Sequence, residues 1–293
     1  MQHAASAIIA PEAGYLPAYW QFHEAVTRAQ LRAWLPPGRH TLVDVSGRRA
    51  PGAELAAEAG HTVLRVIDGA DPGRGDAVPP QEPGGLGDGI TPQEPGGRGG
   101  LGGTVSPQDR GVSGGYPRNK HGRIIRLVAD SSRLTFLNDR CADGVIAEDR
   151  ALSVHLAAEM MIAEIARVLR PAGRVLACVD SLVLGMAVLA DQHQWAQLVD
   201  VPHAEVVLVP WPDGTITRCY GPDQVRELFS GAGLTVNWIR PRTVFSESMV
   251  THWLRREPDS LPKLVRAELA AAADESLGAQ LVISAAKPRG RAH

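Results

Sequence analysis

The sequence has 293 residues, of which 44% are apolar and 21% are charged, so it can form one large or two small folded domains. Its formal net charge of −2, with lysine and arginine spread along the chain, argues against a dedicated surface for nucleic acid or an anionic membrane. The three cysteines are far apart in the sequence and do not have the spacing of metal ligands. No apolar stretch is long enough to span a bilayer, and the first residues do not have the pattern of a signal peptide. These features predict a cytoplasmic protein with reduced thiols, no bound metal and no membrane partner.

Residues 1–40 are predicted to contain one helix ahead of the first strand. Apolar side chains recur at helical spacing from Tyr15 to Trp34, and Pro36 follows them closely. One interpretation is a helix packed on the sheet, and the other is an N-terminal lid that closes over a site at the sheet edge. In the lid interpretation, the side chains expected to contact a ligand are Tyr15, Tyr19, Trp20 or His23.

The stretch from Leu42 to Asp71 is typical of a strand, a turn, a helix and a second strand. Two short apolar runs joined by a helix form a parallel βαβ unit, because parallel strands need a crossover connection. The turn after the first strand then lies at the carboxyl edge of the sheet, where open α/β sheets bind ligands. Asp68, at the end of the second run, is placed to accept hydrogen bonds from ribose hydroxyls. This pattern favours a nucleoside-containing cofactor, with a βαβ unit that binds nothing as the alternative.

Residues 72–121 are predicted to be a flexible insertion. Sixteen of the 31 glycines lie between Gly69 and Gly115, and the hexapeptide Pro80–Gly85 recurs as Pro92–Gly97. Such a segment has too few apolar side chains to offset the entropy cost of ordering it.

The rest of the chain alternates strand and helix patterns. Strands are predicted over 124–128, 144–147, 175–179, 235–239 and 279–285, and helices over 156–169, 182–197, 222–229, 246–256 and 261–273. A hairpin over 205–209 and 215–219, joined by Pro-Asp-Gly, is inserted with the preceding helix at 182–220. Because successive parallel strands end at one edge, four acids are expected there: Asp44, Asp68, Asp130 and Glu148.

Several motifs resemble those of the class I S-adenosylmethionine-dependent methyltransferases, in particular the small-molecule, methyltransferase-11-like branch. Val43-Asp44-Val45-Ser46-Gly47 looks like the first motif, and Asp68, or Ile67 before it, matches the position after the second strand. Asp130 to Phe136 is similar to the Asp-Ala-x-x-Leu-Pro-Phe stretch, and Arg167-Val-Leu-Arg-Pro-Ala-Gly173 is similar to Arg-Val-Leu-Lys-Pro-Gly-Gly. The turn itself is degenerate, because Ser46, Arg48 and Ala50 stand where the family has three glycines.

This resemblance implies a Rossmann-like seven-stranded α/β sheet in the order 3-2-1-4-5-7-6, with the last strand antiparallel and helices on both faces. It makes residues 41–293 the methyltransferase-like domain and S-adenosylmethionine the cofactor. In this reading Asp68 binds the ribose, Asp130 and Ser131 bind the adenine, and the methionine part meets the first motif and the fourth strand. The residues implied for the methionine part are Ser46, Gly47 and Glu148, and Asp44 of the first motif is a further cofactor-binding residue.

Methyl transfer from a sulfonium needs alignment and, for a hydroxyl acceptor, a base. His155, which closely follows the fourth strand, is the candidate base, and an exposed or capping histidine is the alternative. Trp195, Trp211 and Tyr220 either line an apolar acceptor pocket or pack in the core. A small-molecule acceptor is expected, and a homodimer is an open alternative to a monomer.

Two other classes of function remain open at this stage. The first is a protein of the same fold that no longer methylates, such as a cofactor-assisted cyclase or a binding protein. The second is a nicotinamide dehydrogenase, which the sequence disfavours because Gly47 and Gly52 form no Gly-x-Gly pair.

Overall fold

The computed structural model describes residues 18–47, 50–68, 122–211, 213–271, 275 and 277–289. The chain divides into two compact units, of which Met1–Ala70 with Lys120–His293 is one and Asp71–Asn119 is the other. All described residues belong to the first unit, so the predicted insertion at 72–121 lies outside the described residues, as does Tyr15.

The described strands form one sheet in which the predicted order is confirmed. The sheet has nine described strands, and without the inserted hairpin strands β6 and β7 the sixth and seventh strands of the predicted order are β8 and β9. Strand β9 is antiparallel to both neighbours, β5 and β8. The other neighbours, from β3 through β2, β1 and β4 to β5, are parallel. In spatial order the strands are β3 (Arg123–Val128), β2 (Thr62–Ile67), β1 (Thr41–Asp44), β4 (Ala142–Ala147), β5 (Leu169–Ser181), β9 (Gln280–Ala286) and β8 (Thr235–Arg242).

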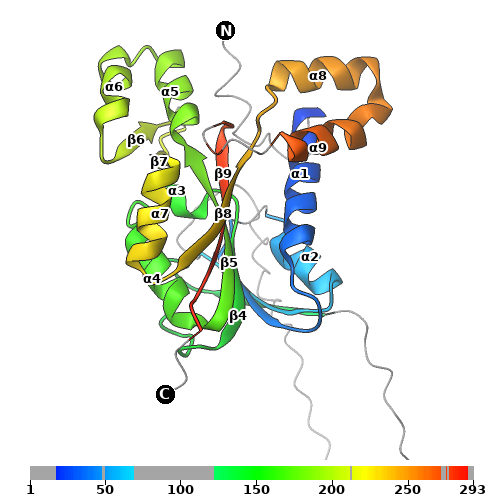
Figure 1. The fold of residues 1–293 in the computed structure, drawn as a ribbon, viewed down its shortest axis with the longest axis vertical. Coiled ribbons are helices and arrows are strands. Elements are labelled where there is room, and N and C mark those ends of the chain that lie inside the picture. The colour runs from blue at the N-terminus through cyan, green and yellow to red at the C-terminus, as the bar shows by residue number, and fades with distance from the viewer. Residues whose placement is uncertain are drawn as a thin grey trace, which may run out of the picture. The chain divides into compact units, whose positions relative to one another are not determined.

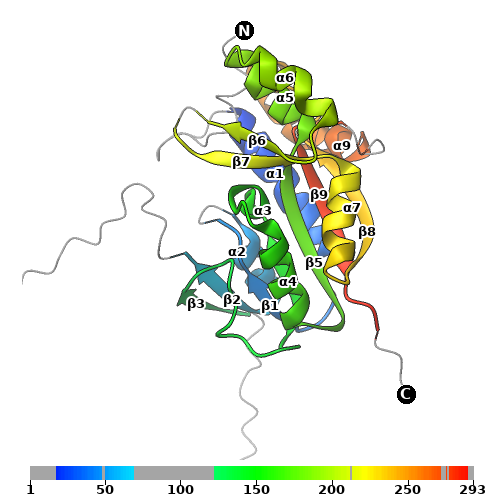
Figure 2. The ribbon, with the colours of Figure 1, turned by 90° about the vertical axis from the view of Figure 1, so that its left-hand side faces the viewer.

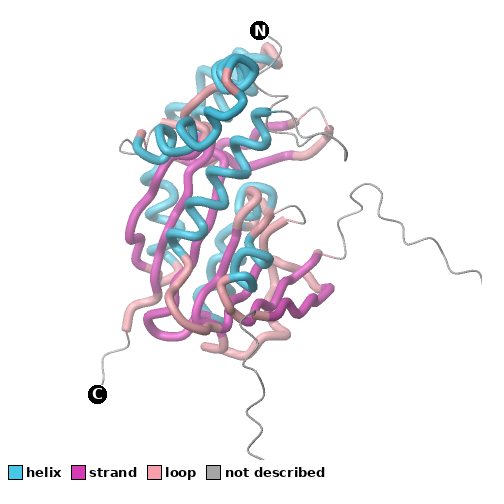
Figure 3. Tube along the Cα trace, turned by 90° about the vertical axis from the view of Figure 1, so that its right-hand side faces the viewer, coloured by secondary structure: helices cyan, strands magenta, loops and turns pink. Residues whose placement is uncertain are grey.

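Helices cover both faces of this sheet, as expected for a Rossmann-like α/β fold (Figures 1 and 3). On one face lie α1 (Ala18–Trp34) and α2 (Gly52–Glu58), and on the other lie α3 (Ala151–Val154), α4 (Ala158–Val168) and α7 (Pro222–Gly231). The central strands β1, β4 and β9 are buried because they are mostly apolar and covered by helices, whereas the edge strands β3 and β8 are partly exposed. None of the helices that the structure describes is long and apolar enough to cross a membrane.

The first half of α1 packs against two later helices, α8 (Glu247–Arg256) and α9 (Leu261–Ala270). Tyr19, Phe22 and Val26 contact Val250 and Leu254 in a small apolar cluster. The second half of α1 packs on the sheet, so this helix bridges the α8–α9 pair and the strands.

The predicted insertion at 182–220 lies at the end of β5 (Figure 2), and its second hairpin strand extends the sheet by pairing in parallel with Asp180 and Ser181. It contains α5 (Leu182–Asp191), α6 (Trp195–Asp200), the 3-10 turn Val201–His203, and a hairpin of β6 (Val207–Pro210) and β7 (Ile216–Tyr220). The single helix predicted over 182–197 is wrong in detail, because His193 adopts a left-handed conformation (φ 58°) and separates α5 from α6. The hairpin is confirmed, and Asp213 stabilises its turn by accepting a hydrogen bond from the Thr215 amide at 2.9 Å.

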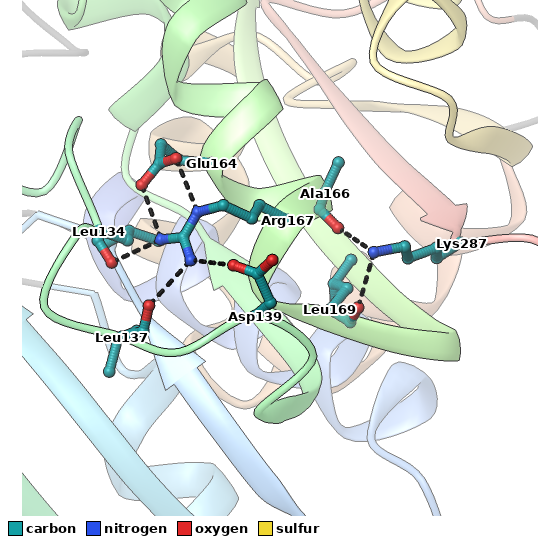
Figure 4. A network of polar contacts seen from close by, with 8 residues as sticks. All are labelled: Leu134, Leu137, Asp139, Glu164, Ala166, Arg167, Leu169 and Lys287. Atoms are coloured by element: carbon teal, nitrogen blue, oxygen red, sulfur yellow. Dashed lines mark hydrogen bonds and ion pairs between the residues drawn. The ribbon is translucent and has the colours of Figure 1, made fainter.

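The Arg167–Gly173 motif has a structural role (Figure 4). The Arg167 guanidinium donates to the backbone carbonyls of Leu134 and Leu137, and it also bonds Glu164 and Asp139. These bonds fasten the segment that follows β3 to helix α4. Lys287 donates to the last carbonyls of α4, from Ala166 and Leu169, and so caps the helix where β5 begins.

Candidate functional site

The carboxyl ends of β1, β2, β3 and β4 meet at one edge of the sheet because these strands are parallel. Each of the four predicted acids follows or ends one of these strands, as expected: Asp44, Asp68, Asp130 and Glu148. The side chains of these four acids have different hydrogen-bond and ion-pair partners, so each has its own local environment at this edge.

Asp44 and Ser46 form the buried base of the first turn. The Ser46 amide donates to Oδ1 of Asp44 at 2.9 Å, and the Ser46 hydroxyl accepts a hydrogen bond from the Glu148 amide at 2.8 Å. Oδ2 of Asp44 is buried and has no hydrogen-bond partner. Burial raises the pKa of Asp44, although the hydrogen bonds from Ser46 act in the opposite direction.

The Glu148 side chain faces the interior, where it forms an ion pair with Arg242. Both carboxylate oxygens of Glu148 accept from the guanidinium, at 2.8 and 3.0 Å, and both residues are 1% exposed. Arg242 also donates to Gln30 of α1 at 2.7 Å. Arg242 was not foreseen from the sequence, since it lies 94 residues from Glu148 and no local pattern connects the two.

Asp149 is the acid that lies against Gly47. A Cβ placed on Gly47 would overlap the Asp149 carboxylate, so only glycine fits at this position without a shift. Asp149 and Arg150 both adopt left-handed conformations, with φ of 57° and 63°. Two consecutive non-glycine residues of this kind are uncommon and mark a turn held by its surroundings.

Asp68, Ser131 and His155 form a hydrogen-bonded chain across the neighbouring strand ends. The Ser131 hydroxyl lies 2.9 Å from Nε2 of His155 and 3.4 Å from Oδ2 of Asp68. Asp130, the exposed neighbour of Ser131, accepts hydrogen bonds from the Ser132 hydroxyl and amide, and the hydroxyl contact is the main reason that its pKa is lowered. The structure therefore brings Asp68, Ser131 and His155 together, although they come from three separate segments.

A second buried ion pair lies beside the inserted hairpin. Nε of Arg150 donates to both carboxylate oxygens of the fully buried Asp180, at 2.9 and 3.0 Å, and its guanidinium stacks 4.6 Å from the centre of the Trp211 ring. Nη2 of Arg150 is buried without a partner, and burial raises the pKa of Asp180 despite the nearby guanidinium. Trp211 and Tyr220 are buried, whereas Trp195 is 58% exposed.

Among the residues that the structure describes, no group of histidine, cysteine and carboxylate side chains has the arrangement of a metal site.

The strand order, with the antiparallel strand β9 between β5 and β8, defines the fold of the class I S-adenosylmethionine-dependent methyltransferases. Solved structures of such proteins share this fold at low sequence identity. An S-adenosylmethionine-dependent methyltransferase from Methanosarcina mazei is 11% identical with a TM-score of 0.51, over 89% of this chain and 97% of that one. A proposed methyltransferase of this kind from Listeria monocytogenes is 12% identical with a TM-score of 0.52, over 92% and 100% of the two chains.

The [4+2]-cyclase SpnF has a similar fold, with 16% identity and a TM-score of 0.50, over 96% of this chain and 86% of that one. No protein-family model matches the sequence, and no curated protein is significantly similar to it.

Proposed function

We propose that this protein is an S-adenosylmethionine-dependent methyltransferase that acts on a small molecule. The observation that carries the proposal is the contact of Ser131 with Asp68 at 3.4 Å. These are two of the three residues implied for the adenosine part of the cofactor, and they come from neighbouring strand ends of a sheet with the matching fold. Carboxylate and hydroxyl oxygens at this spacing suit the hydroxyls and amine of a nucleoside.

The chemistry of the first turn also fits the cofactor. Oδ2 of Asp44 is a buried acceptor without a donor, and a cationic ammonium group is a donor that compensates a buried carboxylate. Of the acids after β4, Glu148 is engaged by Arg242, so we propose that Asp149, which lies against Gly47, takes the role expected of the Glu148 carboxylate. Glu148 then acts through its amide, which holds Ser46.

The cofactor, when bound, supplies a methyl group on a good leaving group, so the protein mainly has to align the acceptor and accept a proton. We propose that His155 is the base and that the hydroxyl of Ser131 determines its tautomer. When Ser131 donates its single proton to Asp68, the Nε2–H of His155 donates to Ser131, and Nδ1 is left as the basic nitrogen.

We propose that Arg150, Asp180 and Trp211 form the acceptor side of the site. Arg150 follows β4, Asp180 lies at the end of β5, and Trp211 lies in the inserted hairpin. Asp149, next to Arg150, contacts the first turn. The unpartnered Nη2 of Arg150 offers two N–H donors to a polar group of the acceptor, and the Trp211 ring offers an apolar surface.

A second candidate function is a non-methylating protein of the same fold. Two observations favour it, namely the replacement of three motif glycines by Ser46, Arg48 and Ala50 in the sequence, and the position of the Asp149 carboxylate over Gly47. A cyclase, SpnF, is among the proteins of similar fold.

Calorimetric titration with S-adenosylmethionine and S-adenosylhomocysteine tests the proposal. We expect micromolar binding that Asp68→Ala abolishes, because the ribose loses its acceptor. The control is Asp191→Ala, an exposed acid at the end of α5. Absence of binding by the wild-type protein would refute the methyltransferase proposal. Binding without methyl transfer to any compound in a metabolite extract would favour the second candidate.

A further inference from the structure

Arg242 is the most deeply buried charged group that connects the N-terminal helix with the sheet. It is 1% exposed at the end of β8, and it donates to Gln30 of α1 and to both oxygens of Glu148. Its guanidinium also lies 3.6 Å from the sulfur of Cys178 on β5. An arginine cannot lose its charge at this site, so it depends on these partners for compensation.

The bonds of Arg242 continue without interruption to the first turn. The Arg242 guanidinium donates to the side-chain oxygen of Gln30 at 2.7 Å and to the two carboxylate oxygens of Glu148 at 2.8 and 3.0 Å. The backbone amide of Glu148 donates to the Ser46 hydroxyl at 2.8 Å. The backbone amide of Ser46 in turn donates to the Asp44 carboxylate at 2.9 Å. These five residues lie in α1, β8, the end of β4, the turn after β1, and β1 itself. The series therefore joins the helix on one face of the sheet to the turn at its carboxyl edge.

The geometry makes this series stiff. A two-point guanidinium–carboxylate pair fixes the orientation of both side chains, and the interior offers no water to replace a lost partner. Glu148 uses its side chain for Arg242 and its amide for Ser46, so a shift in one contact must be accommodated at the other.

We propose that Gln30 and Arg242 are positioning residues for the turn Asp44–Gly47, so that docking of α1 sets the geometry of the cofactor-binding turn. The proposal rests on the proposed function only for the identity of the ligand. In this arrangement, α1 influences cofactor affinity through the interior of the protein, in addition to any contact that it makes as a lid.

The test compares Gln30→Ala, Gln30→Glu and the control Arg28→Ala by hydrogen exchange and calorimetry. Arg28 lies on the same helix but pairs with Glu24 at the surface. In the ligand-free protein, we expect Gln30→Ala to accelerate exchange of the Ser46 and Glu148 amides about tenfold, with Gln30→Glu restoring slow exchange because it keeps an acceptor for Arg242. We also expect about tenfold weaker binding of S-adenosylhomocysteine by Gln30→Ala, and wild-type behaviour of Arg28→Ala in both measurements.

Unchanged exchange of the Ser46 and Glu148 amides in Gln30→Ala, with faster exchange confined to α1, would overturn the proposal. If Gln30→Ala does not fold, Arg242→Lys serves instead, because it keeps the charge and loses the two-point geometry. If the wild-type protein binds no S-adenosylhomocysteine, the proposed function fails, and the exchange of the ligand-free variants still decides this inference.

Discussion

Replacing Arg242 by methionine tests how much the buried ion pair contributes to the fold. The Arg242 and Glu148 side chains are 2% and 1% exposed, so the variant leaves the Glu148 carboxylate buried without its compensating charge. Removing one partner of such a pair typically costs about 3–5 kcal/mol. Removing both charges in Glu148→Met/Arg242→Met avoids the uncompensated carboxylate, and we expect that variant to lie within about 1–2 kcal/mol of the wild type.

Urea unfolding monitored by circular dichroism measures both variants. With a denaturant slope of about 3 kcal/mol per molar, the single variant should lower the unfolding midpoint by about 1 M or more. Arg226→Met is a suitable control because its partners, Asp223 and Glu275, lie at the surface, and its midpoint should change little. A loss below about 1 kcal/mol in Arg242→Met, or a double variant as unstable as the single one, would refute the reasoning.

Three further outcomes are expected. Burial, with a smaller contribution from Arg242, lowers the pKa of His23 to about 4, so the unfolded state gains its proton first as the pH falls. The free energy of unfolding should therefore decrease between about pH 6.5 and pH 4, and His23→Gln should flatten that decrease in a series of urea titrations. Arg167→Ala, which removes the bonds between α4 and the segment after β3, should cost about 1–3 kcal/mol, and Arg167→Lys should cost less; equal losses would argue against a role for the guanidinium geometry. Gly47→Ala should lower the melting temperature by a few degrees because its Cβ overlaps Asp149, and adding Asp149→Ala should restore it if the overlap is the cause.

The positions of the strands could be predicted from local patterns, and their order from the resemblance to the methyltransferases. Each strand is a short apolar run, and the motifs at Val43, Asp130 and Arg167 carry the resemblance that orders those runs. Details set by single backbone conformations could not be read in this way. The left-handed residues Arg150 and His193 lie next to helix ends, and the left-handed conformation is uncommon enough in both residue types that it could not be predicted at these positions.

The candidate site was predictable where it follows strand ends and unpredictable where it depends on distant partners. Asp68 and Ser131 were expected at one edge, and the structure places them in contact there. The orientation of Glu148 was not foreseeable, because it is decided by Arg242, a residue of a late strand. Asp149 was overlooked for a related reason, since the strain in its backbone and its contact with Gly47 exist only in the folded chain.

The position of β9 between β5 and β8 has a consequence for synthesis of the protein. Among the described strands, β8 pairs with β9 alone, and β9 separates it from β5. During synthesis β8 leaves the ribosome before β9. Both edges of β8 therefore stay unpaired until the segment 280–286 has also emerged. Exposed strand edges of this kind associate readily with other chains, so in the interval between these two segments β8 is open to pairing with a strand of another polypeptide.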